Sequence, residues 1–481
     1  MIRNTNVENN NMPRFEPTVD SLMNYQCPAW FKDAKFGIYI HWSAYSVAEA
    51  GDWLPREMYE QGSKPYQAMC EKYGHPSKFG YKDLVPLWKA EKFDPDAMLQ
   101  LFKRAGARYF APCAVHHDNF DLWNSKHTRW NAVNMGPGKD LIGMLRKATL
   151  DAGLRFGVTT HLERTWSWLQ TNKGADRTGP LKGVPYDGND PAFRDLYLAP
   201  DSDTSMCHPR NPPSAWREHW VHRMKDLIDN YHPDHLYFDG AVPFQGDDRA
   251  RSGLDVISHY YNHNMSVHGG RMEGVMCIKN YRMHGYYFDG IATLDFEWDQ
   301  SKNALYDYWQ NDASIASSWG YCAGLTYFSA ETLIHKLVDV VSKNGNMLLS
   351  VPPRANGSLD GQAVTVLEGM GDWLALNGEA IYGTEPWWPA YRTIPDGVRF
   401  TRKDDTLYAI ILKWPETAAL LLPVLGTGEK GSPIRRIEMV GQTEPLRYAQ
   451  DAEALVVTLP QKKPDSIAWT LRLDMPETRE I

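Results

Sequence analysis

The chain has 481 residues, 43% of them hydrophobic, and is therefore long enough for two domains with substantial cores. Charged residues make up 23%, and the formal net charge is −8. This balance gives no basic surface for a nucleic acid, so we expect no nucleic-acid partner.

The chain begins with an Asn-rich stretch, residues 1–11, that lacks the hydrophobic segment of a secretory signal. No apolar run in the whole sequence reaches membrane-spanning length, so we expect a soluble protein without a membrane span. We expect it in the periplasm or outside the cell if a signal peptide has been removed, and in the cytoplasm otherwise. An oligomer is compatible with the sequence.

Amphipathic helical stretches alternate with short apolar runs from about Leu22 to Gly383, a pattern typical of parallel βα units. One clear unit starts at Asp94-Pro95 and stops at Gly106 before the next apolar run. The periodicity predicts helices over 94–105, 139–152, 215–230 and 333–342. Seven or eight candidate strands, among them 325–328 and 346–351, predict a (β/α)8-like barrel.

Beyond Trp388 the pattern changes to short alternating runs separated by Gly, Pro and Asp, which is typical of an antiparallel β domain. The predicted strands are 398–402, 406–412, 419–422, 434–440, 455–459 and 467–473. We therefore predict an α/β protein with a (β/α)8-like catalytic domain over residues 18–385. A C-terminal antiparallel β-sandwich domain is predicted over residues 386–481.

Ionisable side chains stand at the ends of several predicted strands, where an apolar run breaks off. They are His41, His116, His117, His161, Asp239 and Glu297. Because the carboxyl ends of parallel strands meet at one face of a barrel, we expect these side chains to share a pocket.

Two separated carboxylates among histidines and aromatic rings fit glycoside hydrolysis. In that reaction one carboxylate attacks the anomeric carbon and the other protonates the leaving oxygen. Asp239, which ends an apolar strand and precedes Gly240, suits the first role, although Asp-Gly is also a common turn or cap.

The vicinal pair His116 and His117 has three open interpretations: metal ligands, substrate contacts or structural histidines. Adjacent residues of a strand point to opposite faces, so both rings would reach one ion only if the backbone turns there. Neither a Cys-x-x-Cys nor a His-Glu-x-x-His spacing supports a metal.

Several motifs occur in order over most of residues 20–385, and together they resemble glycoside hydrolase family 29, the retaining α-L-fucosidases. The motifs are Trp30–Trp42, Gly51–Trp53, His116–Ser125, Leu236–Gly240, Ser318–Tyr321, Val341–Ser350 and Asn377–Gly383. The resemblance implies a retaining exo-α-L-fucosidase that acts on fucosylated oligosaccharides or glycoconjugates. It implies no cofactor and no metal.

The same resemblance implies roles for individual residues. Asp239 corresponds to the nucleophile, and His41, His116 and His117 correspond to residues that contact sugar hydroxyls. The pair Asp52 and Trp53 and the aromatic Tyr237 are expected at the substrate as well. His161 stands where many members have a tyrosine, so it could reach a hydroxyl or make a structural hydrogen bond.

The acid/base is implied less directly, because its position varies among members of the family. We expect Glu297, which ends a predicted strand shortly before Trp309-Gln310. Asp295 lies two residues earlier on the same face of that strand and competes with it, as does Asp299. We expect Lys279 to face solvent, although it could supply a positive charge where some relatives carry Arg.

Two functions from other classes stay open. A catalytically silent relative that only binds fucose or another carbohydrate would keep the aromatic and histidine pocket without the proton donor. A metal-dependent hydrolase would use the histidines as ligands.

Overall fold

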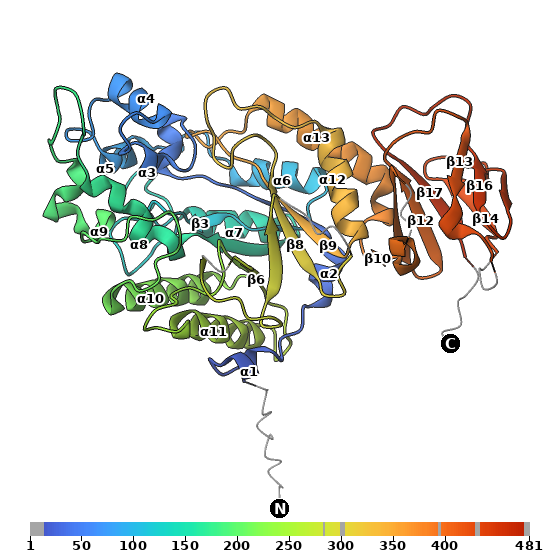
Figure 1. The fold of residues 1–481 in the computed structure, drawn as a ribbon, viewed down its shortest axis with the longest axis horizontal. Helices are drawn as coiled ribbons and strands as arrows, with labels where there is room; N and C mark the ends of the chain where they lie inside the picture. Colours follow the sequence, from blue (N-terminus) through green and yellow to red (C-terminus); the bar gives the residue numbers. More distant parts are fainter. Residues whose placement is uncertain (1–13, 282–283, 299–303, 393–395, 429–432, 476–481) are drawn as a thin grey trace, which may run out of the picture.

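The protein, described by a computed structural model over residues 14–281, 284–298, 304–392, 396–428 and 433–475, is a barrel followed by two antiparallel sheets (Figure 1). The barrel strands all run parallel, and β9 pairs with β1 to close the barrel. They are β1 Phe36–Tyr39, β2 Tyr109–Phe110, β3 Cys113–Val115, β4 Arg155–Thr160, β5 His235–Phe238, β6 Val275–Lys279, β7 Thr293–Glu297, β8 Trp309–Ser314 and β9 Gly345–Ser350. Segments β2 and β3 both pair with β4 and together make one of eight barrel strands, so the predicted barrel is confirmed.

Helices surround the barrel, and those predicted over 94–105, 139–152, 215–230 and 333–342 are among them. The larger ones are α6 Pro95–Arg104, α7 Leu141–Asp151, α10 Ser214–Tyr231, α11 Arg251–Val267, α12 Ala330–Ser342 and α13 Gly361–Asn377. The side chains of Asp94, Asp140 and Ser329 cap three of them by accepting a hydrogen bond from a first-turn N–H. None of the helices among the described residues is long and apolar enough to cross a membrane.

The remaining helices are short. The α-helices are α1 Val19–Leu22, α2 Ala29–Ala34, α3 Leu54–Glu57, α4 Lys64–Lys72, α5 Tyr81–Leu84, α8 Thr165–Trp168 and α9 Arg194–Tyr197. The 3-10 helices are Ala44–Ala48, Val85–Leu87, Leu162–Arg164, Leu169–Lys173, Asp187–Asn189, Pro191–Phe193, Gly378–Ala380, Trp388–Arg392 and Pro423–Leu425. Helices α3, α4, α5, α8 and α9 lie in the long connections after β1 and β4, and they cluster in space (Figure 1).

One predicted strand is wrong. Residues 325–328 form no barrel strand, and Tyr327 only bridges Ala316 in antiparallel fashion. The strand before β9 is β8, with the sequence Trp-Gln-Asn-Asp-Ala-Ser. Its polar residues are buried inside the barrel, so the segment lacks the apolar pattern by which a buried strand is normally identified.

The C-terminal part consists of two antiparallel sheets around a core of their own, as predicted for a β-sandwich. One sheet contains β10 Glu385–Pro386, β11 Val398–Lys403, β12 Thr406–Ile411, β14 Arg436–Met439 and β17 Trp469–Asp474. The other contains β13 Ala419–Leu422, β15 Tyr448–Gln450 and β16 Leu455–Thr458. The sandwich packs against the barrel through Trp373 of α13, whose indole N–H donates to the Ala468 carbonyl at 2.9 Å.

A buried ion pair fixes the loop that follows β3. Arg223 of α10 donates to both carboxylate oxygens of Asp121 and, at 2.5 Å, to the side-chain oxygen of Asn119. Neither charged side chain is exposed to solvent. Because this loop begins with His116 and His117, the ion pair helps to position the carboxyl-terminal face of the barrel.

We expect Arg223→Met to lower the free energy of unfolding by about 3–5 kcal/mol, because it leaves the buried Asp121 carboxylate uncompensated. Urea unfolding followed by tryptophan fluorescence measures the change. The matched control is Arg129→Met, which breaks the pair with Asp195; because the Arg129 side chain is 53% exposed, we expect a cost below about 1 kcal/mol. Equal midpoints for the two variants would contradict the role of the buried pair.

Candidate active site

The residues expected at strand ends meet at the carboxyl-terminal face of the barrel. His41 follows β1, His116 and His117 follow β3, His161 follows β4, Asp239 follows β5, Lys279 ends β6 and Glu297 ends β7. They come from consecutive parts of the barrel wall and converge because parallel strands direct their ends to one face.

Asp239 lies at the centre of this cluster. One carboxylate oxygen accepts a hydrogen bond from Lys279 Nζ at 2.6 Å. The other lies 3.2 Å from His161 Nδ1, 3.4 Å from His117 Nε2 and 3.8 Å from an Arg164 guanidinium nitrogen. Burial alone would raise the pKa of Asp239, but Lys279, His161 and His117 together hold it well below its usual value. The carboxylate is therefore ionised.

The glycine after Asp239 is explained by a close approach. A Cβ at position 240 would lie 2.1 Å from Cε1 of His208. The His208 Nε2 atom is 3.0 Å from the backbone carbonyl oxygen of Asp239. Gly240 thus admits the imidazole that supports the Asp239 backbone, which is a different reason from the turn or cap considered from the sequence.

Lys279 joins Asp239 to Glu297. Its ammonium donates to Asp239 Oδ1 at 2.6 Å and to Glu297 Oε2 at 2.8 Å. These two oxygens can therefore be no farther apart than the sum of the two distances, 5.4 Å. The expectation that Lys279 faces solvent is wrong: its side chain is 2% exposed, because the last residue of β6 points into the barrel mouth.

Glu297 is the more accessible of the two carboxyl groups, with 32% of its side chain exposed. Burial raises its pKa above the usual value, and the nearby Asp312 and Asp239 add to this rise while Lys279 opposes it. The next residue, Trp298, has φ 55°, a left-handed conformation that is rare for a bulky side chain. Hydrogen bonds to both sides of this backbone, from Trp298 N to Asp312 O and from Lys336 Nζ to Trp298 O, hold it in place.

The competing acid Asp295 shares the strand face with Glu297, as expected, but lies one layer deeper in the barrel. It is 1% exposed, and one carboxyl oxygen accepts a hydrogen bond from Gln310 Nε2 at 2.8 Å. Burial, with a further contribution from Asp312, raises its pKa well above the usual value. The other competitor, Asp299, lies outside the described residues.

The vicinal histidines face different neighbours. The His116 Nε2 atom is 3.7 Å from Asp52 Oδ2, and the ring lies tilted against His161 and edge-on to His41. His117 instead faces Asp239, and its Nδ1 lies 2.5 Å from the His161 carbonyl oxygen. Burial lowers the pKa of His41 and His116 well below 6.5 and that of His117 to about 3. The lowered pKa values favour the neutral rings, each with one donor and one acceptor nitrogen.

The same histidines have the spacing of metal ligands. Ring nitrogens of His41, His116 and His161 lie within 4.8 Å of one another, and so do donor atoms of His117, His161 and Asp239. In the second group the carboxylate of Asp239 already has a cationic partner in Lys279. The donor sets fit a transition metal in type, but the ammonium competes for the charge that would attract it.

A cavity of about 400 Å³ has Trp298, the residue after Glu297, on its wall. Its lining consists of Ala50, Gly51, Asp52, Trp53, Glu57, Trp298, Ser317, Ser318 and Trp319. The predicted pair Asp52 and Trp53 is thus on its wall, where Asp52 Oδ1 also accepts from the Gly320 N–H at 2.9 Å. Tyr237 lies below, fully buried, and its hydroxyl donates to Asp312 at 3.2 Å.

Sequence reasoning missed three side chains that contact Asp239 or surround the cavity. Arg164 stands in a 3-10 helix three residues after His161, and its guanidinium lies over the Trp53 ring at 5.8 Å. His208 comes from the segment before α10, and Trp298 follows Glu297 directly. Only Trp298 carried a signal, because it adjoins a predicted strand-end acid.

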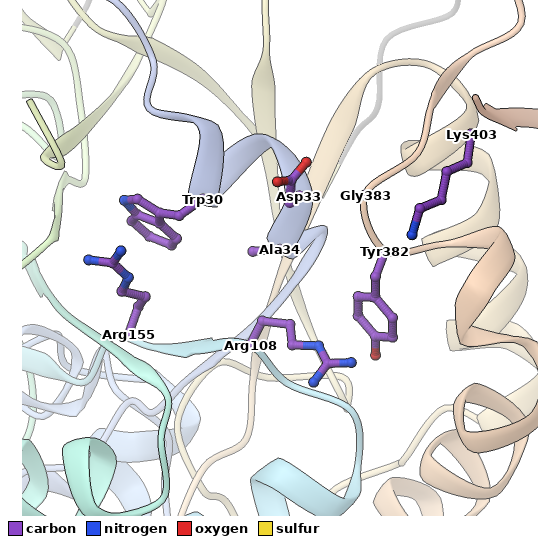
Figure 2. A pocket seen from close by; sticks show the side chains of 8 residues that line it. All are labelled: Trp30, Asp33, Ala34, Arg108, Arg155, Tyr382, Gly383 and Lys403. Carbon is purple, nitrogen blue, oxygen red and sulfur yellow. The ribbon is translucent and has the colours of Figure 1, made fainter.

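A second cavity, of about 520 Å³, lies at the opposite end of the barrel (Figure 2). It is lined by Trp30, Asp33, Ala34, Arg108, Arg155, Tyr382, Gly383 and Lys403. Arg108 and Arg155 stand where β2 and β4 begin, so this is the amino-terminal face, which in barrel enzymes serves stability rather than catalysis. Its lining includes a single carboxylate, Asp33, and no pair that could perform acid–base chemistry.

Known proteins support an assignment of this chain to a family. The sequence model of the α-L-fucosidase family matches residues 2–379, and that of the α-L-fucosidase C-terminal domain matches residues 392–474. Human plasma α-L-fucosidase is 30% identical over 96% of this chain and 92% of its own length. The crystal structure of Thermotoga maritima α-fucosidase is 28% identical, with a TM-score of 0.73 over 96% of this chain and 100% of that chain. The same enzyme in complex with fucose is 29% identical, with a TM-score of 0.73 over 95% of this chain and 100% of that chain. The chain belongs to the α-L-fucosidase family.

Proposed function

We propose that the protein is an exo-acting α-L-fucosidase that removes terminal α-L-fucose from oligosaccharides or glycoconjugates with retention of configuration. The observation that carries this proposal is the Lys279 bridge, which limits Asp239 Oδ1 and Glu297 Oε2 to 5.4 Å. Retaining glycosidases have carboxyl groups about 5–5.5 Å apart, whereas inverting enzymes need about 6.5–9.5 Å to admit a water molecule.

The opposite pKa directions of the two carboxyl groups support distinct roles. Asp239, held ionised, attacks the anomeric carbon of fucose and forms a glycosyl ester. Glu297, whose pKa is raised, protonates the leaving oxygen and then takes a proton from the water that hydrolyses the ester. Because a third of the Glu297 side chain is exposed, it can reach a leaving group that extends toward solvent.

We assign the neutral His41, His116 and His117 to the sugar hydroxyls, with His161 as a further contact that also orients Asp239. Asp52 and Trp53 lie on the cavity wall, where they can bind the sugar or the group attached to it. Tyr237, packed under Lys279, supports the site from below. All of these residues lie within 18–385, so we assign catalysis to that domain and a supporting role to 386–481.

The two alternative functions are separable from this proposal. A silent sugar-binding relative would lack a proton donor, yet Glu297 is beside Asp239. A metal-dependent hydrolase is favoured by the two groups of histidine ligands. It would lose activity in chelator and regain it with zinc or manganese, whereas the proposed mechanism predicts a rate that chelator leaves unchanged.

We expect the protein to release nitrophenol from 4-nitrophenyl α-L-fucoside, and a comparison with the α-L-galactoside measures its preference between the two sugars.

Asp239→Gly should lower kcat by at least about 10³-fold, because the nucleophile is gone. Azide should restore part of the turnover and give a glycosyl azide of inverted configuration, which nuclear magnetic resonance identifies. The wild type in azide is the control and should give no such product. Near-normal activity of Asp239→Gly would contradict the assignment of Asp239 as the nucleophile.

We expect the effect of Glu297→Ala to depend on the leaving group, because a good leaving group departs without protonation. The loss of kcat/KM should be small for a dinitrophenyl fucoside and about 10²–10⁴-fold for a fucosyl disaccharide. The matched control is Asp295→Asn, for which both substrates should respond alike. The reverse pattern would make Asp295 the acid/base.

We expect Lys279→Met to move both limbs of the pH profile of kcat/KM to higher pH. Lys279 lowers the pKa of Asp239, so without it a higher pH is needed to ionise the nucleophile. It also lowers the pKa of Glu297, so without it the acid stays protonated to higher pH. Lys279→Arg keeps the charge and should largely retain the wild-type limbs. An unshifted profile for Lys279→Met would show that the bridge does not set these pKa values.

A further inference from the structure

Outside the candidate active site, helices α10 and α11 carry a separate cluster of metal-binding side chain types. The cluster consists of Asp229 on α10 and of His259 and His263 on α11. The two helices pack side by side on the outer surface of the barrel (Figure 1). Nothing in the proposed reaction uses these residues.

The three side chains converge on one point. Asp229 Oδ1 lies 2.6 Å from His259 Nε2 and 3.3 Å from His263 Nδ1, and all three donor atoms are within 4.8 Å of one another. His259 and His263 are four residues apart, which places both rings on the same helix face. Asp229 is half exposed and both histidines are partly exposed, so the cluster is accessible from solvent.

The spacing matches a tetrahedral metal. Ligand atoms about 2.0–2.1 Å from zinc in a tetrahedron lie about 3.3 Å from one another. The Asp229–His263 distance already has this value, and the shorter Asp229–His259 contact needs to open by less than about 1 Å. Two imidazoles with one carboxylate are donors for zinc, nickel or copper, whereas calcium and magnesium prefer oxygen ligands alone.

A fourth side chain, His232, is placed to hydrogen-bond His263 on the ring nitrogen that would not bind the metal. His232, at the end of α10, has Nδ1 2.7 Å from His263 Nε2, and the two rings are stacked. If His263 Nε2 donates this hydrogen bond, the lone pair of Nδ1 is directed toward Asp229.

The partial negative charge at the C-terminal end of α10 also favours a cation beside Asp229. Asp229 lies in the last turn, where the partial negative charge of the helix end disfavours an acid and favours a cation. Arg146 already donates to the Tyr231 carbonyl oxygen at 2.7 Å. The Asp229 carboxylate, however, is bridged only to the two histidines among the described ion pairs.

We propose that Asp229, His259 and His263 form a surface site for a transition metal of the zinc class, with His232 as the outer partner of His263. The fourth coordination position faces solvent and takes water. The metal links α10 to α11 on the outside of the barrel, and the site is independent of the glycosidase reaction.

The test is a titration of the full chain with Zn²⁺ in neutral buffer, in which calorimetry measures the stoichiometry and the affinity. We expect the wild type to bind one more equivalent than His259→Ala/His263→Ala, with the same rate on 4-nitrophenyl α-L-fucoside for both metal-free proteins. The difference in stoichiometry decides, because the active-site histidines could also bind zinc. Titration with Co²⁺ gives a second readout, since tetrahedral cobalt absorbs visible light strongly and the double variant should lose this absorption.

Two further variants keep the test falsifiable. His127→Ala removes an exposed histidine from a different ring pair, with His222, and should leave the stoichiometry unchanged. His232→Ala should keep the site but weaken its affinity by about 10–100-fold. Circular dichroism checks that each variant is folded. Equal stoichiometry and affinity in the wild type and the double variant would overturn the proposal.

Discussion

The candidate site depends on one interaction, the buried ammonium of Lys279 between Asp239 and Glu297. An unpaired carboxylate as deeply buried as Asp239 would be costly, and a cation at hydrogen-bond distance removes much of that cost. Because a single Nζ atom reaches both acids, it also limits the distance between Asp239 Oδ1 and Glu297 Oε2 to at most 5.4 Å. The same contact therefore supplies charge balance and an upper limit on the oxygen separation that is compatible with a double displacement.

The two carboxyl groups differ because their surroundings differ. Asp239 is enclosed by Lys279, two imidazoles and the Arg164 guanidinium, all of which favour its ionised form. Among the described residues, Glu297 has only Lys279 as a cationic partner, and the acids Asp239 and Asp312 nearby favour its protonated form. The same lysine contacts both carboxyl groups, so their remaining neighbours account for the opposite directions of the two pKa shifts.

Much of this arrangement could be predicted from the sequence, because local signals determine it. Capping residues such as Asp94 and Asp140 mark where helices begin. The ends of the apolar runs predict that Asp239 and Glu297 lie at one face of the barrel. The direction of Lys279 could not be predicted, because it depends on which face of β6 points inward, and that is set by pairing with distant strands. Strand β8 was missed because its buried residues are polar, and His208 because a loop carries it to Asp239.

The polar strand β8 is explained by the layer beneath the carboxylates. Asp312 accepts hydrogen bonds from the hydroxyls of Tyr39 and Tyr237, at 3.4 and 3.2 Å. The side-chain amide of Gln310 donates from Nε2 to Asp295, and its Oε1 lies 2.9 Å from His235 Nε2. Burial and the neighbouring Asp312 raise the pKa of Asp295 well above its usual value, which favours the neutral carboxyl group in this layer. An apolar β8 would leave Asp295, His235 and both tyrosine hydroxyls buried without these hydrogen-bond partners. The buried polar groups on the neighbouring strands therefore require polar residues on β8.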